Sequence, residues 1–264
     1  MKTYVGIGMV LAAALLSGCA TTSHVSRETL VASLGEPTQS PSSSLAAFSL
    51  AAERGFAFSC EVFEDKDGHL LAQGDDGHGN AAQGVATLPA KLEDALSLMR
   101  PGTKNVMIVK SGVASVPLLK ASFAILAEHG SIVLESQNPE VCAALKDVLP
   151  DCDVFLLCDT LSPESVVSTA TSSNVDGVDI SFEQAIQAGD LVARAKDAGL
   201  SVRMHGVEDL SALVRAFAYG AEAVSVRGAQ RLFNEYGSLY LPRDVDREDY
   251  YERVLDGAAF PLGM

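Results

Sequence analysis

Short apolar segments alternate with amphipathic segments along most of this 264-residue chain. The apolar segments are short and rich in branched and aromatic side chains, which predicts β-strands. Eight such strands are expected, at Leu30–Leu34, Phe56–Phe63, Asn105–Lys110, Ile132–Glu135, Val154–Cys158, Gly177–Ile180, Val202–Val207 and Ala223–Val226. Between them apolar residues recur at spacings of three and four, which predicts helices. The clearest helices are Leu45–Glu53, Lys91–Met99, Pro117–Glu128, Glu140–Val148, Leu191–Ala198 and Leu210–Tyr219, and the alternation ends near Gly228.

Strands and helices that alternate in this way form parallel sheets with right-handed crossovers. Eight such units within about 200 residues favour closure of the sheet, so the sequence predicts an α/β fold, a single (β/α)8 TIM-like barrel. A doubly wound open sheet is the alternative, but no glycine-rich phosphate-binding loop follows the first strand. We expect the barrel to span residues 28–230 and a tail, residues 231–264, to pack on or beside it with a short helix near Arg247–Leu255.

One segment interrupts the rhythm of strand and helix. The turn sequence Asp65-Lys66-Asp67-Gly68 is followed by a second apolar run, His69–Ala72. This pattern predicts that the second strand extends into a hairpin at the barrel mouth. The Gly- and Asn-containing stretch Gly74–Gly84 is then a loop.

Composition and charge exclude several classes of protein. The chain is 48% hydrophobic and 20% charged, which is typical of a globular domain. Its formal net charge is −15 and it has no run of Lys or Arg, so nucleic acid is not an expected partner.

The N-terminal residues follow a different pattern. Lys2 precedes the apolar run Val5–Leu16, which is shorter than the about 20 residues that span a bilayer but suits a secretory signal. The run ends at Leu16-Ser17-Gly18-Cys19, which resembles the lipobox of bacterial lipoproteins. The resemblance implies a signal peptide over residues 1–18, acylation of the Cys19 thiol and a tether over residues 19–27. Ala20, as a residue other than Asp, favours the periplasmic face of the outer membrane; an uncleaved anchor is the alternative.

Four further cysteines, Cys60, Cys142, Cys152 and Cys158, would lie in an oxidising compartment, where disulfides are permitted. Their spacing fits no zinc site. Three of them lie in apolar runs, so we expect buried free thiols, and Cys142 with Cys152 is the first disulfide to test.

Residues 28–230 resemble the glycerophosphodiester phosphodiesterase family, TIM-barrel enzymes that act on glycerophosphodiesters. The similarity is firmest over Leu191–Asp209 and Gly220–Val226, which match the family's helix, Gly-Leu turn and last two strands. Ser44–Phe48, Lys66-Asp67-Gly68 and Thr87–Leu96 agree as well. These matches concern the scaffold, so they support the fold far more than the chemistry.

The family's chemistry uses two histidines as general base and acid, and a divalent cation that polarises the phosphate. The two histidine positions fall on Ser33 and Gly74. Since one acid–base group commonly contributes about 10²–10⁴-fold, the resemblance implies negligible residual activity.

The family's metal ligands are mostly replaced as well. Its Glu-x-Asp pair falls on Ser59 and Glu61, and its Glu-x-Lys pair on Ile108 and Lys110. Glu61 is therefore the remaining candidate for a metal ligand, and Ca²⁺ or Mg²⁺ is expected only if the protein is active.

Function in a (β/α)8 barrel resides at the C-terminal ends of the strands. The candidates at this mouth are Ser59, Glu61, Lys110, Glu135, Asp159, Arg203, His205 and Arg227. One hypothesis is that Lys110, Arg203 and Arg227, with Glu135 as a further candidate, hold an anionic ligand such as a phosphate ester. The favoured alternative is that the cations pair internally with Glu61 and Glu135, because buried charges need partners.

The remaining catalytic candidates are Glu61, Lys110 and His205, with His69 and His78 near the mouth as substitutes for the absent histidines. Two functional classes stay open. The favoured one is an inactive, lipid-anchored barrel that needs no cofactor and binds a ligand or an envelope protein. The other is an active phosphodiesterase-like hydrolase of glycerophosphodiesters or phospholipid headgroups with a rebuilt site.

Overall fold

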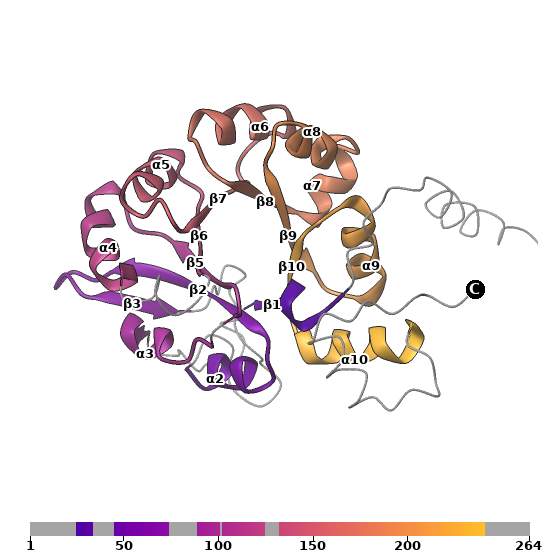
Figure 1. Ribbon diagram of the computed structural model, residues 1–264, viewed down its shortest axis with the longest axis horizontal. Helices are drawn as coiled ribbons and strands as arrows, with labels where there is room; N and C mark the ends of the chain where they lie inside the picture. The colour runs from indigo at the N-terminus through magenta and orange to yellow at the C-terminus, as the bar shows by residue number, and fades with distance from the viewer. Residues whose placement is uncertain (1–24, 34–44, 74–88, 101, 125–131, 241–264) are drawn as a thin grey trace, which may run out of the picture.

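The computed structural model describes residues 25–33, 45–73, 89–100, 102–124 and 132–240. Its eight barrel strands are all parallel and each pairs with its neighbour in the chain. The strands are β1 (Leu30–Ser33), β2 (Ala57–Glu64), β5 (Asn105–Val109), β6 (Ile132–Ser136), β7 (Asp153–Leu157), β8 (Gly177–Ser181), β9 (Ser201–Val207) and β10 (Ala223–Val226). Because β1 pairs with both β2 and β10, the sheet is closed, as the ring in Figure 1 shows. The predicted (β/α)8 barrel is confirmed, and the open sheet is excluded.

The predicted hairpin is present beside the barrel. Strand β3 (Leu70–Gln73) runs antiparallel to β2, and β4 (Ala90–Lys91) pairs with β3. The Asp65 carboxylate accepts hydrogen bonds from the backbone N–H groups of Asp67 and His69, and Gly68 has a positive φ of 82°. These features fix the tight turn. The predicted loop Gly74–Gly84 lies outside the described residues.

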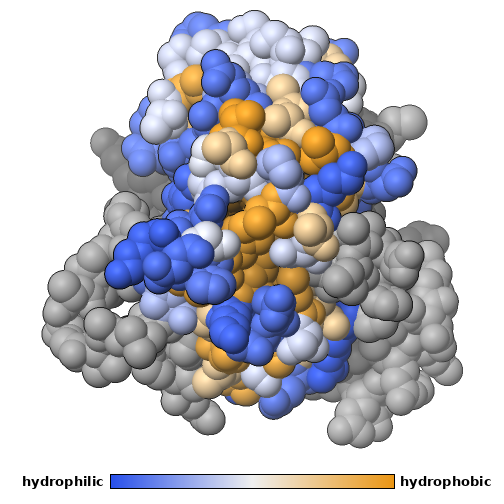
Figure 2. All heavy atoms as spheres, turned by 90° about the vertical axis from the view of Figure 1, so that its left-hand side faces the viewer, coloured by the Kyte–Doolittle hydropathy of each residue, from blue (hydrophilic) through white to orange (hydrophobic). Residues whose placement is uncertain are grey.

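Helices follow the strands where the apolar periodicity was clear. These helices are α2 (Leu45–Glu53), α3 (Leu92–Leu96), α4 (Val116–Ala124), α5 (Pro139–Val148), α8 (Leu191–Asp197) and α9 (Leu210–Tyr219). On the side that carries β3 and α4, apolar side chains gather between polar ones (Figure 2). Val113, of the 3₁₀ helix η3 (Val113–Ser115), and Leu118 are exposed on this side.

Three helices were not predicted. Half of the residues of α6 (Pro163–Ser172) are Ser or Thr and only Val166 and Ala170 are buried, so its periodicity is faint. Helix α7 (Phe182–Gln187) has six residues, too few for a period to emerge.

The expectation that helical order ends near Gly228 is wrong. Helix α10 (Ala229–Tyr240) begins at the next residue, crosses the expected boundary at residue 230 and buries Leu232 and Phe233. Its side chains are mostly polar, so only these few apolar positions mark its inner face. The expected helix near Arg247–Leu255 lies outside the described residues.

The N-terminal residues assigned to a tether are partly packed on the barrel. Val25 contacts the core, and the 3₁₀ helix η1 (Arg27–Thr29) contacts β1 and β10. The Arg27 guanidinium carbon lies 5.6 Å from the ring centre of Phe56 and 5.3 Å from that of Phe233. Residues 25–27, which the prediction assigned to the tether, are therefore part of the folded body. None of the described helices is long and apolar enough to cross a bilayer.

The barrel interior is layered. An apolar layer lies low in the barrel and consists of Val31, Ala57, Val106, Val133 and Phe155. Side chains two residues apart on a strand point to the same side. The next inward layer therefore contains Ser33, Ser59, Ile108 and Glu135, which places polar groups directly above an apolar floor.

The four cysteines of the described chain are free and buried. Cys142 and Cys152 are therefore not bonded to each other, as the preference for core thiols predicted. Burial raises the pKa of the Cys60 and Cys142 thiols to about 12, so neither is reactive at neutral pH.

Candidate functional site at the barrel mouth

A cavity of about 170 Å³ opens at the C-terminal ends of the strands. It is lined by Ser33, Ser59, Cys60, Ile108, Glu135, Leu157, Asp159, Asp179, His205, Gly206, Val207, Glu208, Ser225 and Arg227. This is the end of a (β/α)8 barrel at which ligands bind. Of the eight predicted mouth residues, five line the cavity, whereas Glu61, Lys110 and Arg203 lie beside it.

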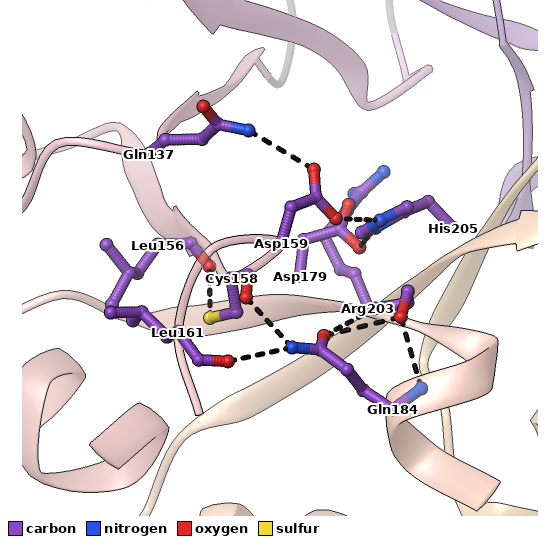
Figure 3. A network of polar contacts seen from close by, with 10 residues as sticks. Gln137, Leu156, Cys158, Asp159, Leu161, Asp179, Gln184, Arg203 and His205 are labelled. Carbon is purple, nitrogen blue, oxygen red and sulfur yellow. Dashed lines mark hydrogen bonds and ion pairs between the residues drawn. The ribbon is translucent and has the colours of Figure 1, made fainter. Parts of the chain in front are cut away.

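His205 is held between two carboxylates. Its Nδ1 lies 2.7 Å from Asp179 Oδ1 and its Nε2 lies 2.6 Å from Asp159 Oδ1 (Figure 3). Burial disfavours the charged imidazole, but the Asp179 charge and the hydrogen bonds to both carboxylates outweigh it and raise the pKa of His205 to about 11. The same contact lowers the pKa of Asp159. His205 is therefore an imidazolium at neutral pH that donates from both nitrogens.

The loop that carries Asp159 is fixed from α7. The Gln184 amide donates to the carbonyl oxygens of Cys158 and Leu161, each at 3.0 Å. Ser181 caps the same helix by accepting from the Gln184 backbone N–H. Gln137 donates to the second carboxylate oxygen of Asp159 at 3.2 Å. These contacts preorganise the carboxylate before any ligand arrives.

A second charged group lies deeper in the barrel. Arg203 Nε is 3.1 Å from Glu135 Oε1 and 3.9 Å from Asp179 Oδ2, and all three side chains are almost completely buried. The guanidinium also lies over the Phe155 ring of the apolar floor. Burial and the nearby Asp179 charge raise the pKa of Glu135 to about 8. Arg203 thus lies between two buried carboxyl groups, while its Nε and Nη2 have no hydrogen-bond partner among the described residues.

A third ion pair links the neighbouring strands β2 and β5. Lys110 Nζ is 2.6 Å from Glu61 Oε1. The Lys110–Glu61 and Arg203–Glu135 pairs are those that the internal-pairing hypothesis expects. They take up two of the three cations that the anion-binding hypothesis would use.

Arg227 and three serines differ from these paired groups. Arg227 is exposed at the cavity and forms no ion pair with a described residue. Ser59 and Ser225 are 4% and 8% exposed, yet neither hydroxyl is hydrogen-bonded to a described residue, and the same holds for Ser33. Because these hydroxyls border the cavity, a ligand or water there can complete their hydrogen bonds.

The metal site of the family does not fit this chain. Within the described residues, no three His, Cys, Asp or Glu side chains are grouped so as to hold a metal ion. The Glu61 carboxylate is engaged by Lys110, and its neighbours at the family's ligand positions are Ser59 and Ile108. A divalent cation here would meet one carboxylate and a competing ammonium group.

Of the two substitute histidines, the structure describes His69, which does not line the cavity. His69 lies in the hairpin turn, largely exposed, with Nδ1 3.4 Å from Asp65 Oδ2. His78 lies outside the described residues. Sequence reasoning missed Asp179, although an acidic residue at an inward position of an apolar strand was a usable signal. It also missed Glu208, which lies in the β9–α9 connection.

Comparisons with known proteins address the fold. No protein-family model matches the chain, and no curated protein matches it. Among solved structures, a glycerophosphodiester phosphodiesterase from Parabacteroides distasonis is similar with a TM-score of 0.65 and 18% identity, covering 80% of this chain and 97% of that one. A putative glycerophosphoryl diester phosphodiesterase from Silicibacter pomeroyi gives 0.64 and 16%, covering 81% and 95%. The enzyme from Thermotoga maritima gives 0.62 and 13%, covering 80% and 100%. At these identities the comparisons show that the chain shares the TIM-barrel fold of glycerophosphodiester phosphodiesterases.

Proposed function

We propose that this protein is a catalytically silent, lipid-anchored barrel that binds a small ligand at its mouth. The proposal rests on the protonation of His205 and on its contacts with two carboxylates. A general base needs a free ring nitrogen, and a general acid works best with a pKa near the working pH. Both ring nitrogens of His205 are bonded to carboxylates, and its pKa is about 11. It therefore serves neither role at neutral pH.

Loss of the metal site supports the same proposal. Glu61 and Lys110 form an ion pair at 2.6 Å where the family would place its metal ligands. Without a metal ion to stabilise the charge on the phosphate and without an acid–base pair to transfer protons, phosphodiester hydrolysis would be slow.

The ligand would be held by the groups that have no partner among the described residues. Arg227 provides one cation, and the hydroxyls of Ser33, Ser59 and Ser225 provide hydrogen bonds. Because Lys110 and Arg203 are paired internally, the site suits a small ligand with a single anionic group, such as a phosphate ester. An envelope protein that reaches the mouth is the second class of partner. Anchoring through acylated Cys19, on the periplasmic face of the outer membrane, completes the proposal.

Hydrolysis assays test whether the barrel mouth lacks catalytic activity. Purified residues 20–264 are incubated with glycerophosphocholine in the presence of Ca²⁺ or Mg²⁺, and in parallel with a chelator. We expect no turnover above the protein-free blank in any condition. Chelator-sensitive turnover that disappears in Glu61→Ala would overturn the proposal and favour an active phosphodiesterase-like hydrolase.

Calorimetric titration with sn-glycerol 3-phosphate tests whether the mouth binds a phosphate ester. We expect saturable binding that is lost in Arg227→Ala. The matched control is Arg215→Ala, which removes an arginine that lies over Phe182 on the outside of the barrel. Equal binding by both variants would exclude the mouth as the site.

A further inference from the structure

We infer that the anchored barrel turns its mouth away from the membrane that holds Cys19, so that its ligand arrives from the aqueous compartment and not from that bilayer's headgroups. This inference rests on the proposed acylation of Cys19. Three observations carry it: where the chain enters the barrel, where the cavity opens, and how short the intervening chain is.

The chain enters at the end of the barrel opposite the cavity. Helix η1 contacts β1 and β10 just before β1 begins at Leu30. Arg27 donates to the carbonyl oxygen of Arg54 at 3.0 Å and lies over Phe56, immediately before β2. Both Leu30 and Phe56 mark the N-terminal ends of parallel strands. Residue 25 is therefore fixed to the N-terminal face of the barrel.

The cavity opens at the other face. Its lining includes Ser33 at the last position of β1, Asp159 after β7 and Arg227 after β10. In a parallel barrel these positions share one end. The point of attachment and the binding site thus lie at opposite poles of the molecule.

The connecting chain is too short to reverse this arrangement. From Cys19 to Val25 there are six residue steps, which span at most about 21 Å when fully extended. A compact body of about 200 residues has a radius of gyration of about 16 Å and hence a diameter of about 40 Å. Bringing the mouth to the bilayer requires a path of about 50 Å, which is a quarter of the circumference followed by a straight segment of one radius. The tether reaches about two fifths of that distance.

Ligand access follows from this geometry. Phospholipid headgroups of the anchoring leaflet would meet the N-terminal face, not the mouth. The mouth faces the aqueous compartment, so the expected ligand is a small soluble molecule.

Site-directed fluorescence measures the orientation. One label is placed at Glu222→Cys, before β10 on the N-terminal face, and another at Glu183→Cys, in the first turn of α7 on the mouth side; both side chains are exposed. The four native cysteines of the barrel are buried, so they compete little for the label. The lipidated proteins are reconstituted in phosphatidylcholine vesicles that contain a headgroup-nitroxide lipid. We expect severalfold quenching of the label at residue 222 and no quenching of the label at residue 183. Equal quenching, or stronger quenching at residue 183, overturns the inference.

Further experiments distinguish a failure of the proposed acylation from a failure of the inferred orientation. Radiolabelled palmitate incorporation into the wild type, with Cys19→Ala as control, tests the acylation itself. If acylation fails, a maleimide lipid is coupled to the Cys19 thiol of residues 19–264, with Glu222→Trp or Glu183→Trp as the fluorophore in place of the cysteine label, since the chain has no other Trp. An insertion of about 20 Gly and Ser residues before residue 25 lengthens the extended reach to about 90 Å. Quenching at residue 183 should then appear, and its continued absence would show that something other than tether length sets the orientation.

Discussion

At the scale of single residues, His205 is where this barrel departs furthest from an acid–base catalyst. The two carboxylates that bond it differ in burial: the Asp179 side chain is 2% exposed and the Asp159 side chain 40% exposed. Loss of the imidazolium would therefore leave one buried carboxylate with only the more distant Arg203 as a counter-charge, 3.9 Å away, and one carboxylate that water can solvate. That difference makes the role of His205 measurable.

Replacing His205 should destabilise the fold. Removal of one partner from a buried ion pair commonly costs about 3–5 kcal/mol, so we expect about 3 kcal/mol for His205→Ala in urea unfolding. Asp159→Ala should cost about 1 kcal/mol, because its pair is partly exposed. Equal costs for the two variants would show that Asp179 does not depend on His205.

Two titrating groups predict how stability varies with pH. Glu135 has a folded pKa of about 8, above the about 4.3 of an unfolded chain, and His205 has about 11 against about 6.5. Each group binds more protons in the folded state between its two pKa values, so the free energy of unfolding falls as pH rises through both windows. Urea unfolding at pH 5, 7 and 9 should show a steady decrease. Glu135→Gln should flatten the part between pH 5 and 8, and an unchanged slope would assign the effect to other groups.

At the scale of elements, the strands were predictable and part of the helical layer was not. A strand such as Ile132–Ser136 is buried at every position, so its apolar run is visible in the sequence. Helix α10 is mostly polar, and only packing on β1 identifies its inner face. The mouth shows the same division. Inward positions such as Glu135 followed from alternation, whereas the bond between His205 and Asp159 depends on a loop held by Gln184, which no local pattern encodes.

The β8 strand offers a test of the packed interior. A Cβ at Gly177 would overlap the Phe155 ring and the Ser201 carbonyl oxygen. Overpacking of this kind costs about 1–3 kcal/mol, so Gly177→Ala should lower the melting temperature. Gly189→Ala is the matched control, because no atom lies within 4 Å of its added Cβ. If the melting temperature of Gly177→Ala equals that of the control, the ring of Phe155 has room to move.

At the scale of the whole molecule, the anchor and the barrel are separable properties. The described part of the chain has no membrane-spanning helix, and the net charge of −15 does not favour anionic headgroups. The proposed acylation of Cys19 therefore predicts that membrane association depends on this residue. We expect Cys19→Ala to move from the membrane fraction to the aqueous phase in a detergent partition, with unchanged circular dichroism. Retention of the variant in the membrane would place the attachment elsewhere.

The thiols report on the whole fold. Cys60, Cys142, Cys152 and Cys158 are free and buried. The export proposed above would bring the protein into an oxidising compartment, where the fold itself must shield these thiols. Burial raises the pKa of each of these thiols, which leaves almost no thiolate at pH 8. Residues 20–264 should react with a thiol reagent only as fast as the molecule opens. In denaturant all four cysteines should react at once. If only two reacted, a disulfide such as Cys142–Cys152 would be present, and the interior would have to rearrange to form it, because the two residues are unbonded in this fold.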